Sequence, residues 1–224
     1  MVADEYMMIC IDNSRYMRLL DPRRYNFQLD CIRSYCRAKL KCNNPKTAIG
    51  IVTMGTFDDS NWLRPTSNLK EILYHLERNF VVGGLLDFKD GIITGELSLP
   101  TDAPNQKRLL FFTGGCVELD IQDAVKFGTC LKGLGVAVDV VNFIVKGYFE
   151  DSTKVLEAFV AAVDCNNNSN ITHIQAELFE HHSGVMSRAP KIFPTSSLEE
   201  GRNQESKVRR GRIMLKMMLL LHML

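Results

Sequence analysis

Short apolar runs alternate with longer, partly polar segments through the first 180 residues of the chain. A short apolar run bounded by turn residues is typical of a strand that is buried on both faces of a parallel sheet. The runs lie at residues 6–11, 47–54, 108–113 and 136–145, with a short edge strand expected at 61–64 and a last strand at 172–178.

Between these strands, apolar residues recur every three or four positions, which is the period of a helix with one buried face. Pro22 suits the first turn of the first helix because its φ is fixed. Either Thr66 or Ser67 is expected to cap the second. The faces expected to be buried are Tyr25, Leu29, Ile32, Cys36 and Leu40; Leu69, Ile72, Leu73 and Leu76; Ile121, Ala124, Val125, Gly128 and Leu131; and Val155, Ala158, Phe159 and Ala162, with a further helix near 88–98.

This alternation of strands and helices predicts the α/β class: a doubly wound, mostly parallel sheet with helices on both faces and right-handed crossovers. In such folds, ligands bind at the carboxyl ends of the strands, at a topological switch point. Asp12, Asn13 and Ser14 follow the first strand directly. Any binding chemistry is therefore expected around them.

The character of the chain changes after about Pro190, where a polar, charged stretch lacks a buried face. We therefore predict a domain at 1–190 and a linker with a short apolar end at 191–224. The apolar end, 213–224, is shorter than the roughly twenty residues that cross a bilayer. Two interpretations stay open for it: a helix that docks on a partner, and a frame-shifted or mis-spliced end of the reading frame.

Composition narrows the setting in which the chain works. Apolar residues make up 46% and the net charge is +1, so no overall field attracts nucleic acid or an acidic membrane. Seven cysteines include no C-x-x-C pair, and the start has no basic region before a long apolar stretch. We expect a reducing compartment, no zinc cluster and no signal peptide.

The strand-end loop resembles a metal site only in part. An Asp-x-Ser-x-Ser sequence at this place would suit Mg²⁺, which prefers carboxylate and hydroxyl oxygens. Here Asp12 and Ser14 are followed by Tyr16, whose bulk is a poor substitute for the second serine, and Arg15 adds positive charge. We predict a degenerate loop with no metal and no cofactor, in which Asp12 and Ser14 bond to loop backbone.

Other polar residues do not form a catalytic set. Glu118 and Asp120 are expected to stabilise the start of the following helix, and the His181-His182 pair to be solvated. Without a nucleophile with its base, or a phosphate-binding loop, we predict that the chain is not an enzyme.

The first strand and its exit, MMICIDNSRYMR, resemble the opening of the von Willebrand factor A domain in the proteasome's non-ATPase regulatory subunit 4 family. The shared residues are Asp12-Asn13-Ser14 and Tyr16-Met17-Arg18, and the tyrosine distinguishes this family from metal-binding relatives such as integrin domains. AIGIVTM, RLLFFTGG and GVAVDVVNF match later strands in the family's order, so the resemblance covers roughly residues 5–180.

The resemblance implies a von Willebrand factor A-like fold and a scaffold that steadies the contact between proteasome lid and base subunits in ubiquitin-dependent degradation. It also implies a location in the cytoplasm and nucleus. In that family, a following segment carries ubiquitin-interacting helices, of which Ser197 and Glu200 match only the ending. Phe193 stands where alanine is expected, and Pro190 and Pro194 interrupt a helix. Polyubiquitin binding therefore stays open.

Three alternatives belong to other classes. A metal-dependent ligand-binding von Willebrand factor A protein, unrelated to the proteasome, would need a working ion site. A subunit of a DNA-repair and transcription complex would usually add zinc-binding cysteine modules. An enzyme would need catalytic groups at the switch point.

Overall fold

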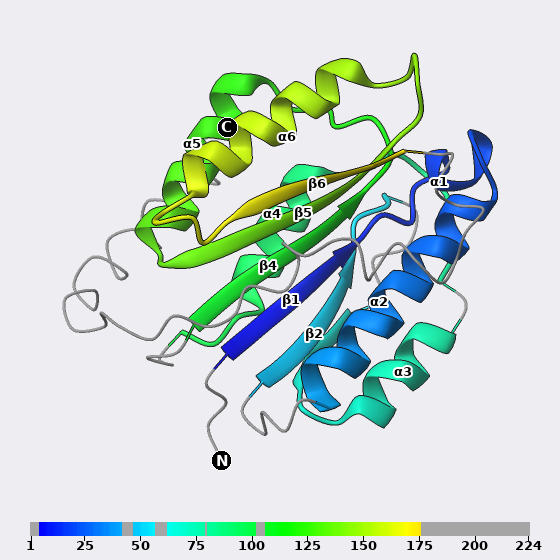
Figure 1. Cartoon of the computed structure of the whole chain (residues 1–224), viewed down its shortest axis with the longest axis vertical. Helices are drawn as coiled ribbons and strands as arrows, with labels where there is room; N and C mark the ends of the chain where they lie inside the picture. The colour runs from blue at the N-terminus through cyan, green and yellow to red at the C-terminus, as the bar shows by residue number, and fades with distance from the viewer. Residues whose placement is uncertain (1–4, 42–46, 57–61, 79, 102–105, 176–224) are drawn as a thin grey trace.

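The central sheet has six strands in the order β3-β2-β1-β4-β5-β6 (Figure 1). The computed structural model describes residues 5–41, 47–56, 62–78, 80–101 and 106–175. Neighbouring strands are parallel except for β3, which pairs antiparallel with β2. The strands are β1 Glu5–Ile11, β2 Thr47–Thr53, β3 Trp62–Thr66, β4 Gln106–Thr113, β5 Val136–Ile144 and β6 Asn170–Gln175.

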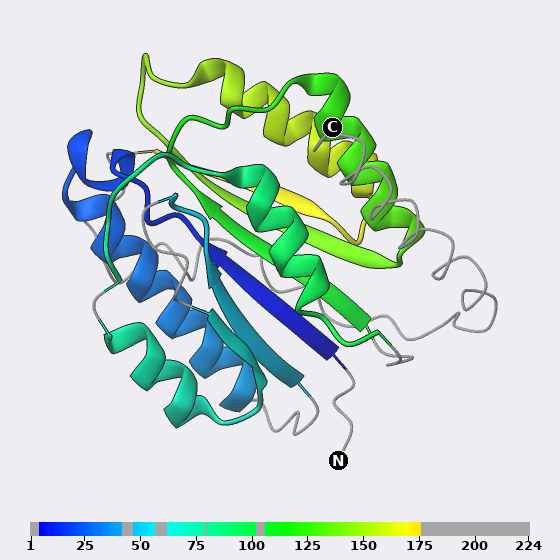
Figure 2. The ribbon, with the colours of Figure 1, turned by 180° about the vertical axis from the view of Figure 1, so that it is seen from behind.

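Helices cover both faces of this sheet. The pair α2 and α3 lies on one face (Figure 1), and α4, α5 and α6 lie on the other (Figure 2). The helices are α1 Tyr16–Leu19, α2 Arg23–Lys41, α3 Leu69–Glu77, α4 Phe88–Leu97, α5 Ile121–Gly133 and α6 Glu150–Val163. The predicted doubly wound, mostly parallel fold is confirmed.

The central strand β1 supplies both halves of the core because its side chains alternate between the two faces. Met7, Ile9 and Ile11 pack with α2 and α3, whereas Met8 and Cys10 pack under α4, α5 and α6. All five are fully buried. A strand with no solvated face explains why the sequence shows a continuous apolar run instead of an alternating pattern.

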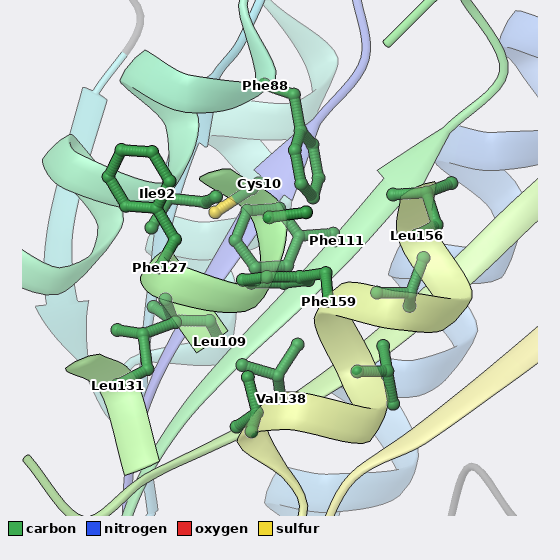
Figure 3. Close-up of a cluster of buried hydrophobic side chains, with 14 of the residues drawn as sticks. Cys10, Phe88, Ile92, Leu109, Phe111, Phe127, Leu131, Val138, Leu156 and Phe159 are labelled. Atoms are coloured by element: carbon green, nitrogen blue, oxygen red, sulfur yellow. The ribbon is translucent and has the colours of Figure 1, made fainter. Parts of the chain in front are cut away.

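Three phenylalanines hold α4 and α6 against the sheet on the second face (Figure 3). Phe88 lies 4.9 Å from Phe111 and 5.4 Å from Phe159 between ring centroids, and Phe111 and Phe159 are 6.0 Å apart. Tilted and edge-to-face pairs at these distances add to the stabilisation from burial alone.

Two details of the helices differ from the sequence prediction. The cap of α3 is Asn68, whose side chain accepts hydrogen bonds from the backbone N–H groups of Lys70 and Glu71, so the choice of Thr66 or Ser67 was wrong. Thr66 instead belongs to β3 and accepts a hydrogen bond from the Asn68 N–H. The one-turn helix α1 has no apolar stripe long enough to predict it.

The buried face of α5 was also predicted only in part. Ile121 and Val125 are 49% and 40% exposed, whereas Ala124, Phe127, Gly128 and Leu131 are buried. The predicted stripe included apolar residues on the exposed side of α5, because the position of α6 decides which side of the helix is buried. The predicted end of the last strand, 176–178, and the whole 191–224 segment lie outside the described residues.

The described cysteines are all free thiols: Cys10, Cys31, Cys36, Cys116, Cys130 and Cys165. Of the helices that the structure describes, none combines the length and apolar character needed to cross a membrane.

Gly128 permits the close packing of α5 on α6, and this can be tested. A Cβ at position 128 would lie 2.7 Å from both the Ala162 Cβ and the Phe159 carbonyl oxygen. Backbone cannot yield cheaply, so we expect Gly128→Ala to lower the free energy of unfolding by about 1–3 kcal/mol. Urea unfolding measures this loss.

The control is Gly133→Ala in the same helix, where no atom lies within 4 Å of the new Cβ. It should leave stability unchanged or raise it by up to about 1 kcal/mol. Equal losses for the two variants would show that α5 and α6 are not in close contact at Gly128.

Candidate functional site

The switch point of the sheet lies between the carboxyl ends of β1 and β4. The chain leaves β1 towards α2 on one face and leaves β4 towards α5 on the other. Asp12 follows β1, and Gly114 and Gly115 follow β4. The predicted position of the candidate site at the end of the first strand is therefore where the two chain reversals meet.

Asp12 binds the backbone of both loops through its carboxylate. Its Oδ1 atom accepts a hydrogen bond from the Ser14 N–H at 2.9 Å, and its Oδ2 atom accepts from the N–H groups of Gly114 and Gly115 at 2.8 Å each. The side chain is completely buried. Both carboxylate oxygens are thus hydrogen-bonded to the backbone of the protein.

Arg24, in the first turn of α2, supplies the opposite charge. It is fully buried, and its Nη2 atom donates to the carbonyl oxygens of Gly114 at 2.6 Å and Phe143 at 2.9 Å. Its Nη1 atom donates to the Tyr16 carbonyl at 3.2 Å. Burial lowers the pKa of Arg24, and the charge of Asp12 opposes that shift. The guanidinium joins the ends of β4 and β5 to α1.

Neutral amides complete the framework around Asp12. Gln28 accepts from the Asp12 backbone N–H at 3.2 Å and donates to the Asp12 carbonyl at 2.9 Å. Asn13 accepts from the Gly55 N–H at 2.6 Å and donates to the Val81 carbonyl at 2.9 Å. The loop after β1 is therefore fastened to α2, to the end of β2 and to the segment before α4.

Position 114 has no room for a side chain. A Cβ there would overlap the Arg24 Nη2 atom and lie 2.6 Å from the Met17 sulfur. A carboxylate from this position would have to displace both side chains. The loop after β4 can therefore offer only its backbone to Asp12.

Tyr16 packs among aromatic side chains instead of offering an oxygen to the loop. Its ring lies 5.0 Å from that of Phe149, nearly edge to face. Its hydroxyl accepts a hydrogen bond from the Arg15 guanidinium at 3.3 Å, and that guanidinium lies 5.2 Å from the centroid of the Tyr16 ring. Tyr16 thus belongs to a rim of aromatic residues at this edge of the sheet.

A divalent cation does not fit this donor set. Such an ion requires several oxygen ligands with free lone pairs. Here Oδ2 of Asp12 already accepts two backbone N–H groups and Oδ1 accepts one, and the positive charge of Arg24 acts on the same carboxylate. The buried Ser14 hydroxyl has no hydrogen-bond partner among the described residues, which would suit a ligand, but it is a single oxygen. Within the described ranges, no group of three or more His, Cys, Asp or Glu is arranged to hold a metal.

Asp12 and Ser14 lie in the loop after β1, whereas Tyr16 begins α1 and packs its ring against Phe149. Asp120 caps α5 by accepting from the Asp123 N–H at 2.7 Å, which confirms its predicted helix-start role. Sequence reasoning missed Arg24 and Gln28. The structure shows a second line of buried residues along α2, each one position before a residue of the apolar stripe. Its members are Arg24, Gln28, Cys31 and Tyr35. The partial ubiquitin-motif residues Ser197 and Glu200, and the pair His181-His182, lie outside the described residues.

Asp12 and Arg24 are opposite charges, both buried and both bound to Gly114, and this arrangement predicts a large stability effect. We expect Asp12→Asn and Arg24→Met each to cost about 3–5 kcal/mol, because either change leaves an uncompensated buried charge. The double variant should cost less than the sum of the two, by about 0.5–3 kcal/mol. Urea unfolding of the four proteins measures the coupling.

Arg23→Met is the matched control, because Arg23 adjoins Arg24 but its side chain is 52% exposed and pairs with Asp21 at the surface. It should cost no more than about 1 kcal/mol. A similar cost for the Arg23 and Arg24 variants would contradict the role given to Arg24.

Metal independence is a separate prediction. Adding Mg²⁺ or Mn²⁺ in millimolar excess, or EDTA, should leave the melting temperature of the chain unchanged. A ligand that binds only the folded state raises stability with its concentration. A rise in melting temperature that is lost in Asp12→Asn would instead support a working ion site.

The comparisons with known proteins agree with the fold. The protein-family model of the von Willebrand factor type A domain matches residues 7–116 of the chain. In solved structures, the chain is similar to the von Willebrand factor A domain of SpRpn10, with a TM-score of 0.71, 22% identity, and coverage of 86% of this chain and 99% of that one. It is also similar in fold to proximal thread matrix protein 1 from the mussel byssus with a zinc-occupied MIDAS motif, with a TM-score of 0.61 and 14% identity over 85% of this chain and 46% of that one.

Sequence relatives are proteasome subunits. The chain is 33% identical over 174 residues to the 26S proteasome non-ATPase regulatory subunit 4 homolog of Oryza sativa subsp. japonica, covering 76% of this chain and 42% of the relative. It is 26% identical to the regulatory subunit RPN10 of Saccharomyces cerevisiae, covering 76% of this chain and 63% of the relative. The chain thus spans less than two thirds of the length of these relatives. Over about three quarters of its length, the chain is therefore similar to the 26S proteasome non-ATPase regulatory subunit 4 family, through a von Willebrand factor A-like domain.

Proposed function

We propose that the chain is a non-catalytic scaffold subunit of the 26S proteasome regulatory particle, where it stabilises the contact between lid and base in ubiquitin-dependent protein degradation. The observation that carries this proposal is that Asp12 and the Arg24 guanidinium both bind Gly114 at the switch point, one at its N–H and the other at its carbonyl oxygen. An internal cation keeps this edge of the sheet in one conformation without an exchangeable ion. A permanently formed edge suits a structural subunit, and the relatives are regulatory subunits of this particle.

The polar groups at this edge support a role without catalysis. Asp12 accepts three backbone hydrogen bonds, and the Ser14 hydroxyl has no partner within the described residues that would act as its base. A nucleophile needs an adjacent base or a lowered pKa to react at neutral pH. The site therefore supports binding through its surface more than chemistry at its centre.

The rim at the carboxyl edge is the surface that we assign to subunit docking. It consists of Arg15, Tyr16, Tyr148 and Phe149, and Tyr148 is 51% exposed. Phe149 adopts a left-handed backbone conformation with φ of 54°, which is costly for a bulky residue and sets its ring against Tyr16. Aromatic and arginine side chains are enriched in the residues that dominate binding energy at protein interfaces.

Polyubiquitin binding stays a prediction beside this proposal. Its sequence basis, Ser197 and Glu200, matches only the ending of a ubiquitin-interacting helix. The proposed role also carries a location in the cytoplasm and nucleus. Both are tested by experiments on the intact chain: a pull-down on ubiquitin chains and imaging of the tagged protein.

A native pull-down of the tagged full chain from its own cells, read by mass spectrometry, tests the scaffold role. We expect lid and base subunits at stoichiometric levels. Tyr148→Ala should reduce their recovery several-fold, since alanine at a central aromatic contact typically costs an interface about 2 kcal/mol or more.

Tyr74→Ala is the matched control, because Tyr74 is 65% exposed on α3, away from the rim. It should leave recovery unchanged. Absence of proteasome subunits with the unaltered chain would overturn the scaffold role, whereas normal recovery with Tyr148→Ala would overturn only the assignment of the rim.

A further inference from the structure

A cleft of about 370 Å³ lies on the face of the sheet opposite to α5 and α6, between the N-terminal half of α2 and the C-terminal end of α3. Its volume is within the range of sites that take small groups. Its lining includes Arg18, Tyr25, Arg33, Leu76, Arg78 and Phe80. The candidate site around Asp12 contributes none of these side chains.

Three arginines line this cleft, and their guanidinium groups differ in their partners. Arg33 donates to the Asp30 carboxylate at 2.9 Å and to the Leu76 carbonyl at 3.4 Å, so it is engaged at the end of α3. Arg18 lies over the Tyr25 ring with its guanidinium carbon 5.2 Å from the centroid. Neither Arg18 nor Arg78 has a carboxylate partner among the described residues, and both are exposed.

Tyr25 adds a buried donor to the same place. Its side chain is 3% exposed, and its hydroxyl has no hydrogen-bond partner within the described ranges. Burial raises the pKa of Tyr25 to about 12, so the hydroxyl is protonated at neutral pH. A buried hydroxyl without a partner is costly, and an acceptor on a bound group would relieve that cost.

The apolar and acidic residues of the lining indicate which kind of anion fits the cleft. Leu29, Leu76 and Phe80 are buried and leave little apolar surface in the cleft, so the accessible lining is mainly polar and charged. Asp30 and Glu77 would repel a doubly charged group more than a single carboxylate. An acidic peptide, whose carboxylates each carry a single charge, matches these features.

We propose that this cleft binds an acidic segment of a partner protein, with Arg18 and Arg78 contacting a carboxylate and the Tyr25 hydroxyl donating to it. Arginine suits this task because its planar group can hold both oxygens of a carboxylate. The inference extends the proposed function by giving one surface a partner chemistry. It is tested with the purified chain alone, so its failure would leave the pull-down result unaffected.

The probe is a short labelled peptide of alternating glutamate and leucine, with a counterpart in which glutamine replaces glutamate. Binding is followed by fluorescence anisotropy at low salt. We expect the glutamate peptide to bind the full chain and the glutamine peptide to bind at least about tenfold more weakly. Arg18→Ala with Arg78→Ala should lower the affinity by a similar factor, and Tyr25→Phe by a smaller one.

The matched control is Arg37→Ala with Lys70→Ala. It removes the same charge from exposed positions of α2 and α3 that do not line the cleft. It should change the affinity less than about threefold, because screened surface charges act weakly at a distance.

Three outcomes would overturn the proposal. Equal losses in the two double variants would mean attraction by overall charge. Absence of binding would exclude the acidic segment as a ligand. Displacement of the peptide by inorganic phosphate at lower concentrations than by unlabelled peptide would make the cleft a phosphate site.

Discussion

The architecture of the carboxyl edge of the sheet depends on one buried guanidinium, that of Arg24. Arg24 has no exposed surface, and burial of an unpaired charge is among the largest costs that a fold can carry. It is offset by three carbonyl acceptors and by the charge of Asp12, which itself accepts three backbone N–H groups. The pair therefore determines the position of the loops after β1, β4 and β5 relative to α2. The buried Arg24 guanidinium thus supplies, from within the chain, a positive charge that joins these loops.

Most of the sheet was predictable because its strands are buried on both faces. β1, β2, β4 and β5 lie under helices on either side, so each leaves a continuous apolar run in the sequence. The helix α2 was equally clear from its long stripe. Prediction failed where neighbours decide the outcome: the exposure of Ile121 and Val125 depends on where α6 lies, and the α3 cap depends on which of three adjacent polar residues the turn places correctly.

Of the candidate site, the sequence predicted the position of Asp12 but not the role of Arg24, and the reason is again physical. Asp12 stands immediately after a strand, and the topology alone brings that position to the switch point. Arg24 stands beside Arg23 in a charged helix start, and the sequence does not distinguish the exposed residue from the buried one. Their difference is one step of about 100° around the helix. The position of Gln28 one turn later, in line with Cys31 and Tyr35, is the local signal that the side of α2 carrying Arg24 faces the sheet.

The helix α1 links the two surfaces that we assign to partners. Its first carbonyl, from Tyr16, accepts a hydrogen bond from Arg24, and its buried Met17 packs beside Gly114. The Tyr16 ring belongs to the rim, whereas Arg18, two residues later, lies over Tyr25 in the cleft. A one-turn helix has too few hydrogen bonds to be stable alone. Its position, and hence the geometry of both surfaces, is therefore maintained by the buried Arg24 guanidinium.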